Sequence, residues 1–271
     1  MRQKVFEVDK EVEHITNWIK EYFLNNGSDT TKAVIGISGG KDSTIAAALL
    51  VRALGPSRVV GVRMPQGKQH DIDDAKQVCD LLKIPSFEIN IANACADLYR
   101  AIDEGYDYDH MCSSNPGVAT NTPARIRMTT LYAVAALVGG RVVNTCNWSE
   151  NYVGYSTKYG DAAGDFSIFH DYTVREVMAI GDYLELPILL VHKVPSDGMC
   201  GSSDEDKLGF SYETLDAYLL DKIVPDYETY RKIETAHKNN RHKEAIHLPY
   251  PRAKTRHWDD IPYEDMEEWS F

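Results

Sequence analysis

The sequence lacks the cysteine patterns that hold disulfide frameworks or structural zinc sites. Its five cysteines, an odd number, are scattered over 271 residues, and no two of them have C-x-x-C spacing. Such usage is typical of reduced thiols in a cytoplasmic protein rather than of a secreted, disulfide-stabilised domain. The first residues are also too polar for a signal peptide. We therefore expect a cytoplasmic protein without a disulfide frame.

Long apolar runs and an excess of positive charge are missing too. The longest nearly apolar run, 131–138, is far shorter than the roughly 20 residues that cross a bilayer. The net charge of −12 argues against general binding to nucleic acid or to anionic membranes. We expect neither as a partner. The acidity gathers near the end of the sequence, where about 258–271 is predicted to be a solvated tail.

The composition is that of an ordinary globular domain. Hydrophobic residues make up 43% of the chain and charged residues 26%, both usual for globular proteins. The length allows one large α/β domain or two small ones. Because no linker and no internal repeat is visible, we expect a single domain over 1–271.

Short β-branched runs alternate with amphipathic stretches in the first half of the chain. This order predicts parallel strands joined by right-handed crossovers. We therefore expect an α/β fold, an open and doubly wound parallel β-sheet with helices on both faces. The expected strands are the run that begins at Ala33 and the segments 58–64, 87–91 and 141–145. The expected helices are 8–24, 43–54, 72–82, 93–104, 123–138, 173–184, 211–219 and 225–238, with irregular loops at 105–122, 146–171 and 192–209.

The first expected strand runs into Ser38-Gly39-Gly40-Lys41-Asp42-Ser43, and a helix follows. Free N–H groups of such a turn and of the helix N-terminus form an anion cradle, which glycines let an anion approach closely. The spacing fits neither a Walker A loop nor the dinucleotide fingerprint. A carboxylate in an anion site indicates that a cation binds there as well. The alternative is a plain turn without a ligand.

Three segments are expected to converge on one crevice. In an open parallel sheet, ligands bind beyond the carboxyl ends of the strands, where the strand order reverses. The Ser38–Ser43 loop, Arg63 and the segment after Thr145 all follow strands. Glu150, five residues after the fourth strand, would pair with Asp42 as a hard oxygen ligand for Mg²⁺. On spacing alone, Glu150 is equally well explained as a solvated loop acid.

The loop resembles the pyrophosphate loop of the ATP pyrophosphatase superfamily, and further segments resemble the NAD synthetase family. They are Gly61–Pro65 with Gln69, the A-R-x-R-M run 124–128, the segment 145–161 with its Thr-Lys-Tyr-Gly-Asp, the D-E-x-x-L-G run 204–209 and the pair His242-Lys243. They occur in the family's order, from the first helix to near residue 250. The resemblance implies an adenine nucleotide α-hydrolase-like fold and ATP-dependent amidation of deamido-NAD through an acyl-adenylate, giving NAD, AMP and pyrophosphate. Ammonia is the expected nitrogen donor, because a glutaminase would need a further domain of about 250 residues.

The same resemblance implies the roles of individual residues. Catalysis would involve Asp42, Lys41 and Lys158, and Mg²⁺ would bind to Asp42 and Glu150. The residues implied at ATP are Ser38, Gly39, Gly40, Asp42, Ser43, Arg63, Gln69, Thr145 and Ser196. The residues implied at deamido-NAD are Arg125, Tyr155, Lys158, Asp161, His242 and Lys243. The family is homodimeric, and the first helix and the helix at 124–138 are the expected interface elements.

Alternatives stay open for several of these residues. Tyr155 is also explained by packing, Lys158 by a surface position and His242-Lys243 by a mobile basic segment. Arg125 and Arg127 lie two apart on a helix and do not share a face, so at least one is expected to be structural.

The sequence departs from the family at two places. Thr145-Cys146-Asn147 stands where the family has Thr-Asp-His. Val174 stands where many relatives have a lysine that contacts nucleotide phosphates. We hypothesise that Lys41 or Lys193 supplies this charge instead.

Rival functions remain to be separated. They are another ligase of the superfamily, such as GMP synthetase, or a non-catalytic nucleotide-binding module on the same fold. GMP synthetase would lack the segment Thr157–Asp161. Enzymes that thiolate tRNA and deazaguanine nitrile synthase depend on zinc or cysteine motifs or on a basic surface, which this sequence lacks. The loops 105–122 and 192–209 are candidate lids.

Overall fold

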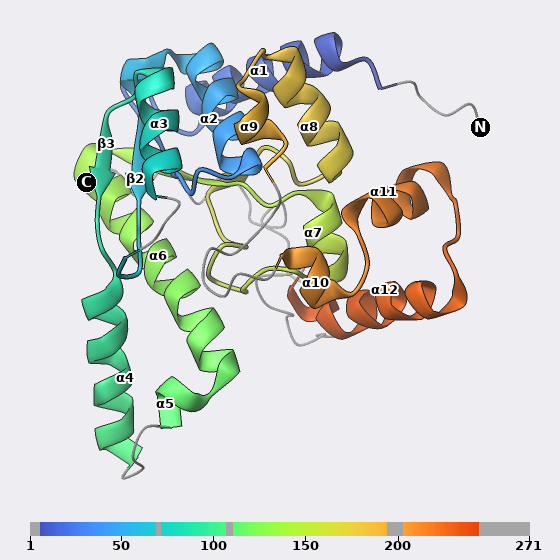
Figure 1. Cartoon of the computed structure of the whole chain (residues 1–271). Coiled ribbons are helices and arrows are strands. Elements are labelled where there is room, and N and C mark those ends of the chain that lie inside the picture. The colour runs from blue at the N-terminus through green and yellow to red at the C-terminus, as the bar shows by residue number, and fades with distance from the viewer. Residues whose placement is uncertain (1–5, 69–71, 107–110, 194–202, 244–271) are drawn as a thin grey trace, which may run out of the picture.

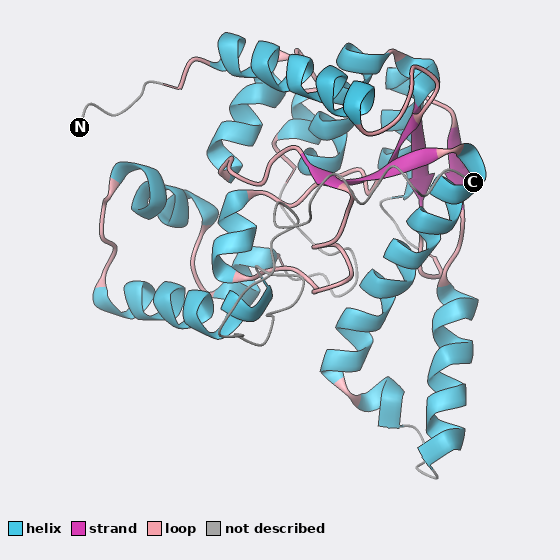
Figure 2. Ribbon diagram, turned by 180° about the vertical axis from the view of Figure 1, so that it is seen from behind, coloured by secondary structure: helices cyan, strands magenta, loops and turns pink. Residues whose placement is uncertain are grey.

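A five-stranded parallel sheet organises the chain. The structure, a computed structural model, describes residues 6–68, 72–106, 111–193 and 203–243. The strand order is β3-β2-β1-β4-β5, and helices lie on both faces of the sheet (Figures 1 and 2). The expected doubly wound parallel sheet is confirmed. The strands are β1 (Lys32–Gly36), β2 (Val59–Arg63), β3 (Ser86–Glu88), β4 (Gly140–Asn144) and β5 (Phe166–Ser167).

The helices follow the predicted periodicity closely in most places. The α-helices are α1 (Val8–Asn25), α2 (Lys41–Leu54), α3 (Ile72–Leu82), α4 (Ala92–Tyr106), α5 (Met111–Ser114), α6 (Pro116–Val138), α7 (Trp148–Val153), α8 (Val174–Tyr183), α9 (Ile188–Val191), α10 (Asp204–Leu208), α11 (Tyr212–Asp221) and α12 (Tyr227–Asn240). Short 3₁₀ turns, η1 (Pro56–Arg58) and η2 (Arg241–Lys243), follow α2 and α12. The expected acidic tail at 258–271 lies outside the described residues.

Several local expectations were wrong. Pro123 does not begin a helix but lies inside α6, which starts at Pro116 behind an Asn115 cap that accepts the N–H of Val118 at 3.1 Å. Proline suits the first helical position, and Pro123 costs α6 one internal hydrogen bond. Much of the expected loop 105–122 is therefore helical. The expected loop 146–171 contains α7 and the edge strand β5, and the end of the expected loop 192–209 contains α10.

The two faces of the sheet bury different strand residues. Side chains alternate between the faces of a strand, so Ala33 and Ile35 pack with α1, α2, α3 and α8, while Val34 packs with α4 and α6. Helix α2 is buried along most of its length, and its Leu49 and Leu50 are fully inaccessible. The helix that follows the Ser38–Ser43 loop is thus anchored in the main core, which fixes the loop against the sheet.

A third group of helices packs beside the sheet around its own core. Val153 of α7, Leu215 of α11 and Ile233 of α12 are buried together. The carboxylate of Asp216 on α11 joins this group to α8, because it accepts the hydroxyl of Ser149 on α7 and the backbone N–H of Arg175 on α8, the latter at 2.7 Å. In Figure 1, α11 and α12 lie on the opposite side of the molecule from α4 and α6. We call α7, α10, α11 and α12 the helical unit.

The strand order reverses between β1 and β4. Strand β1 pairs with β2 on one side and with β4 on the other, with Lys32 opposite Gly140 in register. The loop after β1 and the segment after β4 therefore leave the same edge of the sheet side by side. Open α/β sheets bind their ligands at such a switch point.

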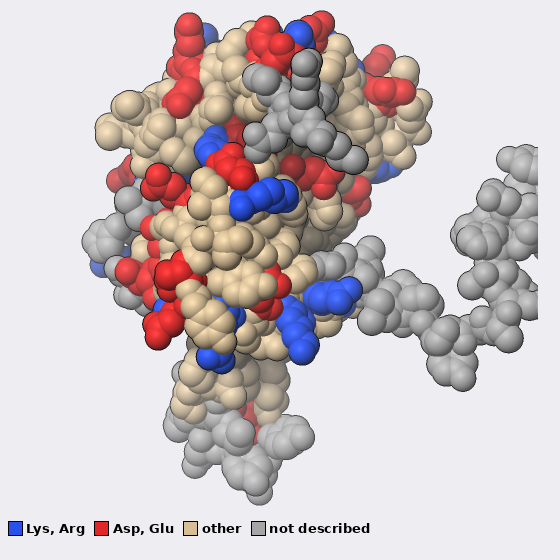
Figure 3. Space-filling model, turned by 90° about the vertical axis from the view of Figure 1, so that its right-hand side faces the viewer, with Lys and Arg blue, Asp and Glu red and all other residues tan. Residues whose placement is uncertain are grey.

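The described surface carries charges of both signs. On the face shown in Figure 3, acidic and basic side chains are interspersed. Over the described ranges, no helix combines the length and the apolar character that a membrane span requires.

Candidate active site

A cavity of about 910 Å³ opens at the carboxyl edge of the sheet, at the switch point. Its walls come from the loop after β1, from α6, from the segment after β4 and from the helical unit. Among the predicted site residues, those that line it are Ser38, Gly40, Lys41, Asp42, Ser43, Thr145, Glu150, Tyr155, Asp161 and Lys243. As expected, the Ser38–Ser43 loop and the segment after β4 converge on this cavity. The end of β2 contributes Met64 and Pro65 to the lining, but Arg63 does not line it.

The Ser38–Ser43 loop is held by its own side chains. The hydroxyls of Ser38 and Ser43 lie 3.1 Å apart, and the N–H of Gly40 donates to Ser38 Oγ at 3.2 Å. Gly39 has φ +77, and a Cβ there would come within 2.7 Å of Asp74 Cβ and 2.8 Å of the backbone N of Ala75. Only glycine fits both the backbone conformation and the contact with α3.

Asp42 and Glu150 are connected through one buried asparagine. Asn147, fully inaccessible, donates its side-chain N–H to Asp42 Oδ1 at 3.1 Å and its backbone N–H to Glu150 Oε2 at 3.1 Å. Its own Oδ1 accepts the N–H of Glu150 at 3.0 Å, which completes a capping box at the start of α7. Burial and the neighbouring charge of Asp42 raise the pKa of Glu150. A cation between the two carboxylates would relieve this repulsion.

Lys41 is buried beside these carboxylates. It is 4% exposed, and its Nζ lies 2.9 Å from Asp42 Oδ2. Burial alone would lower the pKa of Lys41, but the charges of Asp42 and Glu150 outweigh burial and raise it. The ammonium group also lies 5.8 Å from the centre of the Tyr212 ring. The backbone of Lys41 is therefore part of the loop, while its ammonium group contacts the carboxylate pair.

A second polar cluster lies next to Lys41, on the helical unit. Tyr155 donates its hydroxyl to Asp204 Oδ1 at 2.9 Å. Asp204 is buried and begins α10 behind the cap of Ser203. Tyr212 is also buried, and burial together with the charges of Glu150 and Asp204 raises the pKa of its phenol. This cluster adds a hydrogen-bonding wall opposite the loop.

Lys243 and Asp161 shape the turn that carries Tyr155. The Lys243 ammonium donates to the carbonyls of Gly154 and Ser156 at 2.6 and 2.9 Å. The Asp161 carboxylate accepts the backbone N–H of Thr157 at 2.8 Å, and burial raises the pKa of Asp161. Both side chains line the cavity while they brace its wall.

Other predicted residues lie beside the cavity rather than in its lining. Lys158 donates its ammonium to the carbonyl of His242 at 2.6 Å, and Arg125 Nε donates to the carbonyl of Lys158 at 3.2 Å. Arg63 pairs with Glu88 at 2.6 Å across β2 and β3. Their roles at the substrates stay predictions, as do those of Gln69 and Ser196, which lie outside the described residues.

Several residues in or behind the cavity lining were not predicted. Arg127 lines the cavity and donates its Nε to the carbonyl of Met64 at 3.1 Å. Lys193, named only as a possible charge donor, also lines it and pairs with Asp74 at 2.7 Å. Asn147 could have been found, because the spacing Asn-x-x-Glu before a helix is a capping-box signal. The position of Arg127 depends on how α6 packs across β1 and β4 and has no local signal.

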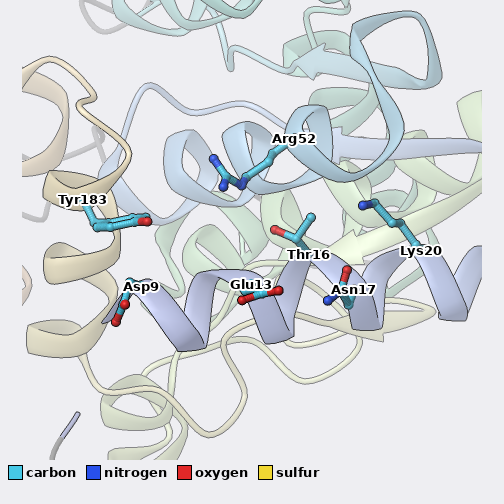
Figure 4. Close-up of a pocket in the computed structure, with 7 residues that line it drawn as sticks. All are labelled: Asp9, Glu13, Thr16, Asn17, Lys20, Arg52 and Tyr183. Atoms are coloured by element: carbon cyan, nitrogen blue, oxygen red, sulfur yellow. The ribbon is translucent and has the colours of Figure 1, made fainter. Parts of the chain in front are cut away.

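A smaller pocket of about 550 Å³ lies among α1, α2 and α8, helices on one face of the sheet. Figure 4 shows Glu13 and Lys20 of α1 near Arg52 of α2. Charges of both signs line it. It shares no residue with the larger cavity.

The family model and two curated relatives that match this chain indicate the same family. A family model described as NAD synthase matches residues 11–249. The chain is 36% identical over 248 residues to an NH(3)-dependent NAD(+) synthetase of Alkaliphilus metalliredigens, and the alignment covers 89% of this chain and 97% of the relative. It is 34% identical over 258 residues to an NH(3)-dependent NAD(+) synthetase of Streptomyces coelicolor, with 90% and 91% covered.

Solved structures resemble the chain over nearly its whole length. A structure of NMN synthetase from Francisella tularensis aligns with a TM-score of 0.81 at 28% identity and covers 92% of this chain and 100% of that one. An NAD+ synthetase from Burkholderia pseudomallei aligns with a TM-score of 0.72 at 27% identity and covers 89% and 91%.

Proposed function

The chain belongs to the NAD synthase family, and we propose that it amidates deamido-NAD with ammonia at the expense of ATP, giving NAD, AMP and pyrophosphate. One observation carries this proposal. The phosphate cradle at Ser38–Ser43 and the Asp42–Glu150 carboxylate pair open into the same cavity, and Asn147 links the two carboxylates. Cleavage of a nucleoside triphosphate needs both an anion cradle and a cation site, because together they stabilise the charge on the leaving pyrophosphate.

The reaction begins with a carboxylate, which does not form an amide with ammonia in water because its leaving group is poor. The nicotinate carboxylate of deamido-NAD attacks the α-phosphorus of ATP, and the bond to the bridging oxygen of pyrophosphate breaks. Ammonia then attacks the carbonyl carbon of the acyl-adenylate, loses a proton and expels AMP. The N–H groups of the loop stabilise the charge that gathers on pyrophosphate, and the walls of the cavity shield the acyl-adenylate from water.

Mg²⁺ is part of the proposal, and the residues present fit it. Among the described residues, no group of three or more His, Cys, Asp or Glu side chains could hold a metal by itself. Two carboxylates plus substrate phosphates are, however, the usual ligands of Mg²⁺ in nucleotide sites. Asp42 and Glu150 would provide the two carboxylates, and their mutual repulsion would be relieved. The ion, when bound, would neutralise charge on the phosphates.

The second substrate is proposed to lie toward the helical unit. Tyr155, Asp161 and Lys243 line that wall, and the Arg127 guanidinium lines the neighbouring α6 wall. Aromatic and cationic groups suit a dinucleotide that carries a pyridine ring and two phosphates.

A second candidate substrate is nicotinate mononucleotide. The alignment with the NMN synthetase from Francisella tularensis has a TM-score of 0.81, against 0.72 for the Burkholderia NAD+ synthetase. The mononucleotide has the same reacting carboxylate but lacks the adenylyl half. The chemistry and the loop would be unchanged, and only the outer wall of the cavity would differ.

We also propose that the protein acts as a homodimer. The two expected interface elements, α1 and α6, meet at one edge of the sheet, where Tyr22 of α1 and Tyr132 of α6 both donate to Asp165, at 3.4 and 3.2 Å. Around this point Trp18 is 44% exposed and Tyr132 is 40% exposed. Exposed aromatic side chains at an edge strand suit contact with a second copy.

One assay tests the proposal. The protein is incubated with ATP, Mg²⁺, ammonium and deamido-NAD, and in parallel with nicotinate mononucleotide, and the nucleotides are quantified by chromatography. We expect NAD, AMP and pyrophosphate in equal amounts. A faster reaction with the mononucleotide would establish the second candidate. Absence of AMP with both substrates would contradict a catalytic role and favour a nucleotide-binding module.

A further inference from the structure

The carboxylate pair already holds a positive charge of its own. Lys41 reaches its ammonium into the space beside Asp42 and Glu150, where it is buried and lies 2.9 Å from Asp42 Oδ2. A lysine that begins a helix in a phosphate loop has a four-carbon stem long enough to reach an anion in the cradle instead. In this structure it turns toward the carboxylates.

We propose that Lys41 is a resident counter-cation that must leave Asp42 before a divalent ion can bind, so that the ion enters together with ATP and not ahead of it. The inference rests on the proposed role of Asp42 and Glu150 as the metal pair. It assigns to Lys41 the part of a positioning residue that couples metal binding to nucleotide binding.

The hydrogen bonds of Asp42 support this order. Its Oδ1 accepts the side-chain N–H of Asn147 at 3.1 Å, and its Oδ2 accepts the ammonium of Lys41 at 2.9 Å. Asn147 is fully inaccessible, and its other contacts hold Glu150, so it has no room to move. Oδ2 is therefore the oxygen through which a divalent ion would bind, and Lys41 stands in the way. Two cations cannot share this position, because both are desolvated and repel each other.

ATP supplies the reason for Lys41 to leave. Its β- and γ-phosphates, held by the N–H groups next to Lys41, would offer the ammonium a more highly charged partner than Asp42. Once Lys41 has turned to the phosphates, Oδ2 is open and the arriving ion gains phosphate ligands as well. Metal and nucleotide then raise each other's affinity, as linkage requires.

The test measures Mn²⁺ binding to the protein without substrates, by isothermal titration and electron paramagnetic resonance. In Lys41→Met the competing charge is gone, and we expect the Kd for Mn²⁺ to fall by about tenfold or more relative to wild type. A non-hydrolysable ATP analogue should strongly lower the Kd of the wild type for Mn²⁺. In Lys41→Met the same analogue should lower the Kd less, by about the factor that separates the two proteins without substrates. Lys41→Arg retains a cation and is expected to bind Mn²⁺ as weakly as wild type.

Matched variants separate this inference from its premise. Lys193→Met removes a charge from the same cavity but from the Asp74 pair, and should change the Kd for Mn²⁺ by less than about threefold. Asp42→Asn should abolish the site, and retained Mn²⁺ binding there would show that the proposed metal pair is wrong. Thermal unfolding checks that each variant folds, and Lys41→Gln replaces Lys41→Met if the latter does not. An unchanged or higher Kd in a folded Lys41 variant that lacks the charge would overturn the inference.

Discussion

The two walls of the cavity are built in different ways. On the sheet side, the phosphate loop is closed by contacts between neighbours, such as the hydroxyls of Ser38 and Ser43, five positions apart. On the helical side, the contacts join distant segments, since Tyr155 meets Asp204 across 49 positions and Lys243 meets Gly154 across 89. We call the side formed by the Ser38–Ser43 loop the sheet wall and the side formed by α10 and the turn after α7 the helical wall. The geometry of the sheet wall is therefore determined by local sequence and by the core below it. The helical wall depends on how a separate group of helices packs.

This difference suggests a division of labour. The sheet wall carries the groups that we propose act in bond cleavage, whose geometry must be fixed, and the main core holds α2 rigidly. The helical wall, which packs around a smaller core of its own, carries the groups that we propose recognise the second substrate. Variants of the sheet wall should change turnover, and variants of the helical wall should change the choice and affinity of the substrate.

The largest effect is expected from Asp42→Asn on the sheet wall. Loss of the carboxylate removes a proposed metal ligand and should lower AMP formation by about 100-fold or more, as for other groups that stabilise transition-state charge. Steady-state assays at saturating ATP measure this change. Asp73→Asn, an exposed carboxylate on α3, is the matched control and should retain full activity. Comparable activity of the two variants would remove Asp42 from the chemistry.

Gly39→Ala should strongly destabilise the sheet wall. The new Cβ would require an alanine at φ +77 and would clash with Asp74 and Ala75 of α3. The conformation alone costs about 1–2 kcal/mol, and the clash adds to it. Chemical denaturation gives the loss of unfolding free energy, and Gly105→Ala, where a Cβ meets nothing within 4 Å, is the control. Equal stability of both variants would mean that the loop does not pack on α3 as described.

Asp216→Asn tests the attachment of the helical wall. The two carboxylate oxygens of Asp216 accept from the Ser149 hydroxyl and from the N–H of Arg175. An asparagine has only one side-chain oxygen, so it can keep only one of these two acceptor positions. We expect a loss of about 1–2 kcal/mol of unfolding free energy and a larger rise in KM for the dinucleotide than for ATP. Asp221→Asn, which breaks only a partly exposed pair with Arg175, should cost clearly less than Asp216→Asn. Equal rises in both KM values would argue against separate walls.

The smallest effect is expected from Lys243→Met. This variant loses two hydrogen bonds to the turn that carries Tyr155, so we expect KM for the dinucleotide to rise about fivefold, equivalent to about 1 kcal/mol, with kcat nearly unchanged. Lys238→Met, an exposed lysine on α12, is the control and should behave as wild type. A fall in kcat alone would place Lys243 in the chemistry instead of in substrate binding.

The same contrast explains what the sequence could predict. The strand, glycine turn and helix around Ser38–Ser43 form one local pattern, so the cradle and its position at a strand end could be predicted. The pairing of Asp204 with Tyr155 could not, because it depends on the packing of α10 against the turn after α7. The resemblance implied Arg125 at the substrate, but the packing of α6 on the sheet places Arg127 in the cavity lining and Arg125 beside it, and no local pattern predicts this.

Two further differences have local causes that were misjudged. Pro123 was taken as a helix start, yet the Asn115 cap and Pro116 begin α6 earlier, and the helix tolerates an interior proline. The Asn-x-x-Glu spacing of Asn147 and Glu150 predicts a capping box, and the side chain of Asn147 also donates to Asp42.

The central claim is that one cavity uses ATP to activate a carboxylate by adenylation, and an oxygen-tracing experiment tests it most directly. Deamido-NAD labelled with ¹⁸O in both carboxylate oxygens is converted with ATP, Mg²⁺ and ammonium, and the products are analysed by mass spectrometry. Attack of the carboxylate on the α-phosphorus predicts one ¹⁸O in every AMP and none in pyrophosphate. Formation of ADP, or AMP that carries no label while NAD is made, would contradict the account.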